Sequence, residues 1–268
     1  MARPADPAAV LQQVMTSAKY ASLDESFVRR IADEASARCR DHGAAVKYAR
    51  RKLHQAVGAF VTGSAGDAVQ ACVSAIRSGV PAKEACLASM RRHASTAERT
   101  AVLDVFYQQI ETWCGRPSAV ADLACGLGPL ALPWLATGPD ATYWCCDIDR
   151  DLTAALPALS EPLGVAVLAE PRDLVRPARL PPAELVLLLK TLTTLEQQRS
   201  GAARDVLAGL GAPRVVVSLP RGSLSARRRF TDDPLEIIGK ATADTPYVLA
   251  GRAAFGGEAL YLLERTGR

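Results

Sequence analysis

The spacing of hydrophobic residues changes partway along the chain. Before residue 92 they recur at the three- and four-residue intervals of helices, with no β-branched alternation between them. This pattern predicts helices over about residues 7–19, 24–41, 44–60, 67–78 and 81–90. After residue 118, short apolar runs alternate with further helical segments. The sequence therefore predicts an all-helical front part and an α/β rear part.

Apolar runs of the rear part have the length and composition of strands. Five of them are as uniformly apolar as parallel strands buried on both faces: 120–123, 143–146, 164–169, 185–189 and 215–219. Two more, 247–255 and 258–264, are split by Gly256-Gly257 and predict a closing hairpin. Together they predict a doubly wound, Rossmann-like α/β sheet, and ligands bind such sheets beyond the carboxyl ends of the strands.

The first of these runs leads into a glycine-rich turn. Asp122, Gly126 and Gly128 form the pattern Asp-x-x-x-Gly-x-Gly, and a residue without Cβ lets the backbone approach a ligand closely. Asp147 ends the next run about 20 residues later, where a carboxylate can accept both hydroxyls of a nucleotide ribose. Ala131 also completes a dinucleotide-binding pattern, so NAD is an alternative ligand. A further alternative is that the turn binds no ligand. The position of Asp122 is typical of S-adenosylmethionine sites.

Two later turns fall at the same predicted edge of the sheet. Asp173, in a polar turn with Arg172 and Leu174, could face an adenine ring. Lys190 follows the fourth strand, where it could assist a reaction electrostatically or face solvent. Four candidate residues converge on one edge of the sheet: Gly126, Asp147, Asp173 and Lys190. This convergence indicates a ligand-binding site more strongly than any single motif does.

A polar segment precedes the α/β part. Ser95 and Glu98 have the spacing of a capping box, which predicts a helix from here to about Cys114. Arg99 then lies in the first turn, where its charge opposes the helix dipole. A cation in that position favours an anionic partner, such as the carboxylate of a ligand.

The predicted third helix carries a basic stripe. Lys47, Arg50, Arg51 and His54 follow helical spacing beside an apolar stripe. The first 99 residues hold 15 lysines and arginines against 9 aspartates and glutamates, a net +6, whereas the remainder is −2. A solvated face is the alternative, but solvated faces usually mix the two signs. The stripe therefore favours a surface that binds phosphates.

A second group of arginines follows the fifth predicted strand. It comprises Arg221, Arg227, Arg228 and Arg229. Near the ligand edge these side chains would hold phosphates close to the reacting centre, or they belong to a solvated loop.

The seven cysteines form no metal-binding or disulfide pattern. Their number is odd and no Cys-x-x-Cys occurs, so we expect buried thiols and no metal site. No window is apolar for long enough to span a membrane, and no signal pattern is found at the N-terminus. We expect a cytoplasmic protein.

Several stretches, in order along nearly the whole chain, match one known pattern. They are Lys19-Tyr20, Lys52-Leu-His54-Gln, His93-Ala-Ser-Thr-Ala-Glu-Arg99, residues 122–134, 187–192 with 195–197, 216–220 and 223–225. Together they resemble the aminoglycoside-resistance 16S ribosomal RNA methyltransferases, which modify N7 of a decoding-site guanine. The chain differs from that family in two loops. It has Leu-Gly-Pro-Leu in place of Leu-Asn-Pro-Leu in the first glycine loop, and Pro-Arg-Gly-Ser-Leu in place of Pro-Thr-Arg-Ser-Leu at 220–224.

The resemblance implies a class I S-adenosylmethionine-dependent methyltransferase domain at 93–268 and an N-terminal helical domain at 1–92 that docks on the 30S subunit. Besides Gly126 of the glycine-rich turn, it also implies the residues that hold S-adenosylmethionine: Phe60, His93, Ala94, Ser95, Thr96, Ala97, Glu98, Arg99, Ala124, Asp147, Asp173, Leu174, Leu189 and Gln198. Within this set Arg99 would pair with the methionine carboxylate, Asp147 with the ribose, and Asp173 and Leu174 with the adenine.

The resemblance further implies a monomeric enzyme that methylates 16S rRNA in the assembled 30S subunit and confers aminoglycoside resistance. Guanine N7 carries a lone pair and no proton, so the reaction needs no general base and depends on positioning. The sequence agrees, because it lacks two motifs that other methyltransferases use. Asn-Pro-Pro-Tyr after the fourth strand serves methylation of an exocyclic amine, and Pro-Cys serves attack on pyrimidine C6; neither occurs here. The alternatives are methylation of adenine N1 in rRNA or of a small molecule, and a ribosome-binding protein without activity.

Overall fold

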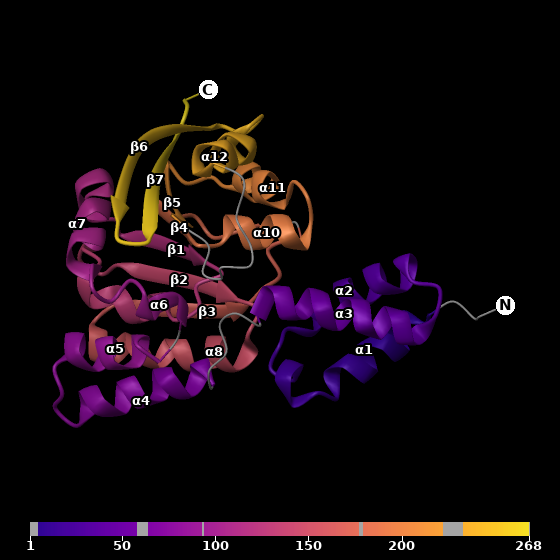
Figure 1. Cartoon of the computed structure of the whole chain (residues 1–268). Coiled ribbons are helices and arrows are strands. Elements are labelled where there is room, and N and C mark those ends of the chain that lie inside the picture. The colour runs from indigo at the N-terminus through magenta and orange to yellow at the C-terminus, as the bar shows by residue number, and fades with distance from the viewer. Residues whose placement is uncertain (1–4, 58–63, 93, 177–178, 222–232, 268) are drawn as a thin grey trace.

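A computed structural model of the protein describes residues 5–57, 64–92, 94–176, 179–221 and 233–267 (Figure 1). Within these residues a seven-stranded sheet has the order β3-β2-β1-β4-β5-β7-β6. The strands are β1 (Ala119–Leu123), β2 (Thr142–Asp147), β3 (Ala166–Pro171), β4 (Leu185–Leu189), β5 (Arg214–Pro220), β6 (Tyr247–Phe255) and β7 (Glu258–Arg265). Strands β1 to β5 are parallel, and β7 runs antiparallel to both of its neighbours. The predicted doubly wound α/β fold is confirmed.

Helices cover both faces of this sheet, because alternate residues of each strand point to opposite sides. On one face Val120, Tyr143 and Leu187 pack with helices from residues 65–163. These are α4 (Ala65–Arg77), α5 (Ala82–Met90), α7 (Leu103–Cys114), η2 (Gly128–Trp134), α8 (Arg150–Ala155), η3 (Leu156–Leu159) and α9 (Ser160–Leu163). On the other face Leu123 and Val186 pack with α10 (Leu192–Gln198), α11 (Ala202–Gly209) and α12 (Pro234–Thr242).

The first helices form a separate unit beside the sheet (Figure 1). This three-helix unit consists of the α-helices α1 (Pro7–Met15), α2 (Glu25–Arg38) and α3 (His42–Val57), with the short 3₁₀-helix η1 (Ala18–Tyr20) between α1 and α2. It has its own apolar core, in which Val10, Phe27, Ile31 and Leu53 are buried. In the described part of the chain, no helix is both long and apolar enough to cross a membrane.

Helices α4 and α5 lie on the sheet rather than on the three-helix unit. Val69, Cys72, Cys86 and Met90 belong to the same apolar core as the sheet residue Tyr143. The sequence assigned these helices to the helical domain, because their spacing shows which face is apolar but not what that face packs against. The boundary at residue 92 stays a prediction, and the unit that packs independently is α1–α3.

The three-helix unit joins the α/β part at the carboxyl end of β2. The backbone N–H of Asp24 donates to the carbonyl of Ile148 at 2.7 Å, and Leu23 and Asp149 form an isolated antiparallel bridge. The N–H of Arg150 donates to the carbonyl of Ser22 at 2.8 Å. These contacts place the helical unit against the ligand edge of the sheet.

One predicted helix is divided in the structure. The helix expected from Ser95 to Cys114 is interrupted: α6 covers only Ala94–Ala97, and α7 begins at Leu103. Between them the N–H of Val102 donates to the carbonyl of Arg99 in a tight turn, which directs the Arg99 side chain inward. The segment after the glycine-rich turn is a 3₁₀-helix, η2, which holds Pro129 near its start and Pro133 inside it, and proline removes an N–H donor that an α-helix needs.

Candidate active site

A cavity of about 540 Å³ lies between the carboxyl edge of the sheet and the three-helix unit. Its lining includes many of the residues predicted to hold the cofactor: Thr96, Arg99, Ala124, Gly126, Asp147, Asp173, Leu174, Leu189 and Gln198. Lys190 lines it as well, as do Lys19, Leu23 and Phe27 of the three-helix unit. The structure therefore gathers these predicted residues in one place. This place is the switch point of the sheet, where the connections that follow the neighbouring strands β1 and β4 run to opposite sides of the sheet.

Some predicted residues lie elsewhere or cannot be placed. Ala97 and Glu98 are outside the cavity lining. Phe60 and His93 lie outside the described residues, and so do Arg227, Arg228 and Arg229. The side chains of Ala94 and Ser95 are likewise not described.

The glycine-rich turn brings the backbone to the cavity. Gly126 has a φ of +49°, and a Cβ added there would meet no atom within 4 Å. Its N–H donates to Asp147 Oδ2 at 2.9 Å, and the N–H of Asp149 donates to Asp147 Oδ1 at 3.1 Å. Burial raises the pKa of Asp147, although these backbone N–H groups act in the opposite direction. The contacts fix the orientation of the carboxylate predicted to bind the ribose.

Asp122 has a structural partner in the neighbouring strand. It is 1% exposed, and the Tyr143 hydroxyl donates to its Oδ2 at 2.6 Å. A Cβ on Gly128 would come within 2.6 Å of the same oxygen, so the second glycine of the motif makes room for this carboxyl group. Burial raises the pKa of Asp122 to about 7, against the opposing effects of Tyr143 and Arg99.

Arg99 is buried in an ion pair with Glu258, the first residue of β7. Its Nε and one terminal nitrogen donate to the two carboxylate oxygens at 3.0 and 2.6 Å, and both residues are 4% exposed. The guanidinium also lies over the Phe106 ring, 4.5 Å from its centroid. Although burial opposes the charge, Glu258 raises the pKa of Arg99. The sequence predicted an anionic partner for Arg99 but did not identify Glu258.

Lys190 belongs to the same group of charges. Its side chain is 10% exposed, and Nζ lies 2.7 Å from Glu98 Oε2 and 3.8 Å from Glu258 Oε2. The residue has a φ of +59°, a rare conformation for a residue with a Cβ, directly after β4. Of the two predicted alternatives, the structure favours a lysine held at the cavity over one that faces solvent.

Two residues predicted to hold the cofactor, Asp173 and Gln198, contact the three-helix unit. Asp173 receives two hydrogen bonds from Arg30 of α2. Gln198 is 4% exposed, and Lys52 of α3 donates to its backbone carbonyl at 3.1 Å. No local pattern in the sequence marks Arg30 or Lys52 for these roles, because their partners lie more than 140 positions away in the chain.

The cavity fits S-adenosylmethionine in volume and in polar groups. Ligand pockets commonly enclose about 300–1,000 Å³. The Gln198 Oε1 atom is buried, and among the described residues it has no hydrogen-bond partner. A buried polar atom without a partner is costly, so a donor from a ligand would stabilise it. The described residues contain no group of three or more metal-ligating side chains.

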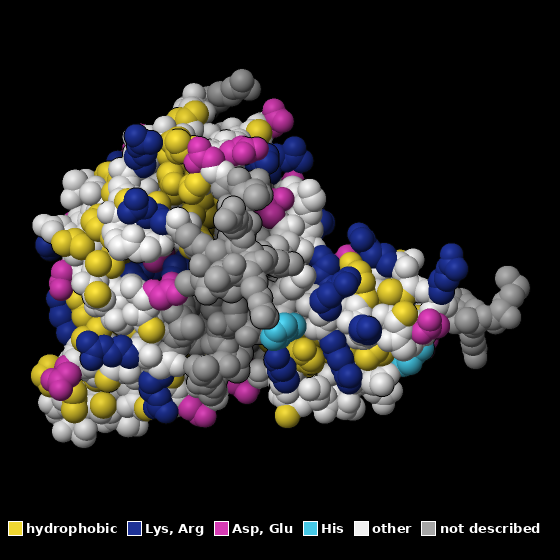
Figure 2. Space-filling model, viewed as in Figure 1, with side chains coloured by type: hydrophobic (Ala, Val, Ile, Leu, Met, Phe, Trp, Pro, Cys, Tyr) yellow, Lys and Arg dark blue, Asp and Glu magenta, His cyan; other side chains and the backbone are white. Residues whose placement is uncertain are grey.

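The predicted basic stripe is exposed on α3. Lys47, Arg50, Arg51 and His54 all face solvent, while Val46, Ala49 and Leu53 of the same helix are buried. Figure 2 shows Lys and Arg side chains spread over the visible face of the three-helix unit. His54 Nδ1 lies 2.9 Å from Lys19 Nζ, which adds a further cation to the stripe. Arg221 is exposed, and its N–H donates to the carbonyl of Gly257 in the β6–β7 turn at 2.7 Å.

Comparison with known proteins gives one consistent result. The family described as "Ribosomal RNA methyltransferase (FmrO)" matches residues 16–253. A 16S rRNA (guanine(1405)-N(7))-methyltransferase of Micromonospora olivasterospora is 49% identical over 252 residues, which cover 93% of this chain and 85% of that protein. A protein of the same name from Serratia marcescens is 31% identical over 260 residues, or 96% of this chain and 98% of that protein.

A solved structure agrees with the sequence relatives. It is that of the 16S rRNA methyltransferase RmtF in complex with S-adenosyl-L-homocysteine, which is 28% identical to this chain. The two superpose with a TM-score of 0.84, over 99% of this chain and 100% of that one. The similarity therefore includes the three-helix unit as well as the sheet.

Proposed function

The chain belongs to the FmrO family of ribosomal RNA methyltransferases, and from this premise we propose that it methylates N7 of a decoding-site guanine of 16S rRNA in the 30S subunit. S-Adenosylmethionine is the methyl donor of this enzyme class. The reaction matches the name of the relatives that cover nearly the whole chain. The product protects the ribosome against gentamicin- and kanamycin-type aminoglycosides and leaves apramycin active.

The observation that carries this proposal is the cavity at the carboxyl edge of the sheet. It joins the glycine-rich turn, Asp147 and Asp173 with an unpartnered Gln198 Oε1. Asp147 would accept the ribose hydroxyls, and Gly126 would allow the backbone to come close to the ligand. Asp173 and Leu174 would contact the adenine.

Arg99 would bind the methionine carboxylate while it keeps its contact with Glu258. A guanidinium has five N–H groups, and the two hydrogen bonds to Glu258 leave others for a ligand. Since Arg99 already lines the cavity, it needs no rearrangement to reach an anion there.

Bound S-adenosylmethionine would supply an electrophilic methyl group on a sulfonium centre; the nucleophile would form a bond to the methyl carbon as the carbon–sulfur bond breaks and the thioether leaves. Guanine N7 provides a lone pair, so the protein need not remove a proton. The chain contributes a fixed orientation of the two reactants. The buried Arg99–Glu258 pair and Lys190 form a rigid group of charges at the edge of the sheet where the reaction takes place. N7 of a stacked base is hard to reach, so the target base is flipped out of its stack.

We infer that the enzyme acts as a monomer in the cytoplasm, where 30S subunits are found. The basic stripe of α3 supplies phosphate contacts to the rRNA. The two loops that differ from the family pattern, at 126–129 and 220–224, bear on the choice of target nucleotide.

Product mapping tests the proposal. Purified protein is incubated with 30S subunits and labelled S-adenosylmethionine, and the extracted rRNA is treated with borohydride and aniline. We expect strand scission at one decoding-site guanine. A reverse-transcription stop at an adenine without scission would assign the enzyme to adenine N1 instead, and label transfer to neither base would refute rRNA methylation.

A further inference from the structure

One carboxylate at the nucleotide end of the cavity is bound by a residue of the three-helix unit. Arg30 of α2 donates through Nε to Asp173 Oδ2 at 2.6 Å and through a terminal nitrogen to Oδ1 at 3.3 Å. The Asp173 side chain is 3% exposed and that of Arg30 is 17% exposed. A two-point contact between a guanidinium and a carboxylate fixes the plane as well as the position of both groups.

The neighbouring arginine shows that this contact is specific to position 30. Arg29 is exposed, and it pairs with Glu25 one turn earlier on the same helix. Arg30 points the other way, with its guanidinium over the Phe27 ring at 5.3 Å from the centroid. Phe27 is itself part of the cavity wall and of the core of the three-helix unit. Arg30 therefore connects that core to the adenine side of the cavity.

Asp173 keeps room for a ligand while it binds Arg30. Besides the two bonds from Arg30, its Oδ1 accepts the N–H of Val175 at 3.1 Å. An ionised carboxylate has about four lone-pair sites, so one site stays open for a donor such as an exocyclic amino group. Arg30 orients this acceptor without occupying it completely.

A second contact crosses the same junction. Nζ of Lys52 on α3 donates to the carbonyls of Gln197 and Gln198 at 2.9 and 3.1 Å, at the end of α10. The side-chain amide of Gln198 donates back to the Lys52 carbonyl at 3.4 Å. This exchange fixes the side chain of Gln198, a residue of the cavity lining whose Oε1 has no partner among the described residues. The unit that carries the basic stripe thus orients two residues that line the cavity, Asp173 and Gln198.

We propose that Arg30 is a positioning residue that sets Asp173 for the adenine of the cofactor and couples cofactor affinity to docking of the three-helix unit on rRNA. The inference rests on the proposed function for the identity of the ligand. If docking shifts α2, the shift reaches Asp173 through Arg30, and the cofactor-binding affinity changes with it. Coupling of this kind is reciprocal, so bound cofactor changes the affinity for the 30S subunit by the same factor.

The first test measures S-adenosylhomocysteine binding to the full chain by calorimetry. Arg30→Ala should weaken binding roughly tenfold or more, because the charged hydrogen bonds that orient Asp173 are removed. Arg30→Lys, which keeps the charge but not the two-point geometry, should fall between this variant and the wild type. Arg29→Ala removes the adjacent arginine and should bind as the wild type does. Thermal unfolding of each variant checks that the fold is retained.

A double-mutant cycle then separates positioning from general damage. In an Asp173→Asn background, Arg30→Ala should cause little further loss, because the residue through which it acts has changed. A full tenfold loss in that background, or equal affinities for the Arg30→Ala and Arg29→Ala variants, would overturn the proposal. A wild type that does not bind S-adenosylhomocysteine would refute the proposed function instead.

The coupling is tested by equilibrium dialysis of labelled S-adenosylhomocysteine with and without 30S subunits. Addition of subunits should change the affinity of the Arg29→Ala variant more than that of the Arg30→Ala variant, in which the Lys52 contact still crosses the junction. No change with either variant, or the same change with both, would overturn the coupling.

Discussion

At the residue scale, Asp122 places a carboxyl group inside an apolar strand and gives the protein a specific pH dependence. Burial raises its pKa to about 7, whereas an unfolded aspartate titrates near 3.9. The folded protein therefore holds a proton that the unfolded chain releases between these two values, so this carboxyl group stabilises the fold less as the pH rises through that window.

Asp122→Asn tests this dependence, because an amide can accept the Tyr143 hydrogen bond without titrating. The free energy of unfolding of the wild type, taken relative to the variant, should fall by on the order of 2–3 kcal/mol from pH 5 to pH 8. Urea unfolding of both proteins at each pH measures this difference. A difference that is the same at both pH values would mean that Asp122 titrates normally in the fold.

Asp147 is the residue on which cofactor affinity should depend most directly. Asp147→Ala removes at least one charged hydrogen bond to the ribose, and one such bond contributes about 1.5–3 kcal/mol, so we expect a loss in affinity of at least about 10- to 100-fold. Calorimetry with S-adenosylmethionine measures the loss, and NAD should not bind to either protein. Asp104→Ala, an exposed carboxylate on α7, is the control. Unchanged affinity in the Asp147 variant would rule out the ribose contact.

The Arg99–Glu258 pair should matter for stability as a unit. Glu258→Ala leaves a buried guanidinium without its partner, which we expect to lower the free energy of unfolding by about 3–5 kcal/mol. The double change Arg99→Met with Glu258→Met removes both charges and should cost much less. Denaturant midpoints compare the two variants, and an equal or greater loss in the double variant would contradict this account.

Single residues of the site could be predicted from the sequence where a local pattern marked them. Gly126, Asp147 and Lys190 each follow a recognisable strand, and all three line the cavity. Glu258 and Arg30 carry no such mark, since each acts on a residue more than 140 positions away. Their roles depend on how the elements pack, which local spacing does not determine.

At the scale of elements, the strands could be predicted better than the helices. The apolar run at 185–189 coincides with β4, and the run at 247–255 coincides with β6. The capping-box spacing at Ser95 predicted one helix where the chain forms two, because a tight turn at Arg99 interrupts it. The apolar faces of α4 and α5 were also predictable, but their packing on the sheet was not.

The basic stripe of α3 is the element we expect to bind rRNA. Replacing Arg50 and Arg51 by alanine should weaken binding to 30S subunits and reduce the log–log salt slope by up to about 0.9 for each phosphate that the variant no longer neutralises. Cofactor affinity should stay the same. Filter binding over a range of salt concentrations measures both the affinity and the slope.

The matched control removes two exposed arginines from the α/β part, Arg204 on α11 and Arg252 on β6. This variant changes the net charge by the same amount, so it corrects for the general attraction between protein and RNA. If both variants bind 30S subunits equally well, the stripe on α3 is a solvated surface.

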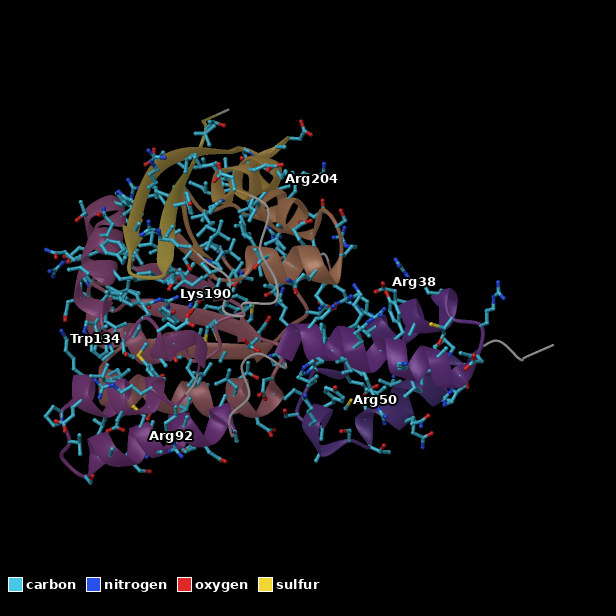
Figure 3. The ribbon with its side chains drawn as sticks, in the orientation of Figure 1. Arg38, Arg50, Arg92, Trp134, Lys190 and Arg204 are labelled. Atoms are coloured by element: carbon cyan, nitrogen blue, oxygen red, sulfur yellow. The ribbon has the colours of Figure 1, made fainter. Side chains whose placement is uncertain are left out.

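At the scale of the whole molecule, the basic stripe and the cavity lie on different parts. Figure 3 shows Arg38 and Arg50 on the three-helix unit and Lys190 at the strand ends of the α/β part. The three-helix unit has a separate core. It joins the α/β part through backbone contacts at residues 22–24 and 148–150 and through the side chains of Arg30 and Lys52. Its basic surface and the cavity are therefore held at a set spacing.

That spacing predicts which form of the substrate the enzyme accepts. A flexible single strand can fill the cavity or contact the stripe, but it does not hold a guanine and distant phosphates at one fixed separation. Assembled 30S subunits present a rigid RNA surface, so we expect efficient methylation of 30S particles and little or none of protein-free 16S rRNA or of guanosine. Transfer of labelled methyl groups to each substrate at equal concentration measures this preference. Equal rates on naked rRNA and on 30S particles would show that the enzyme reads local sequence rather than an assembled surface.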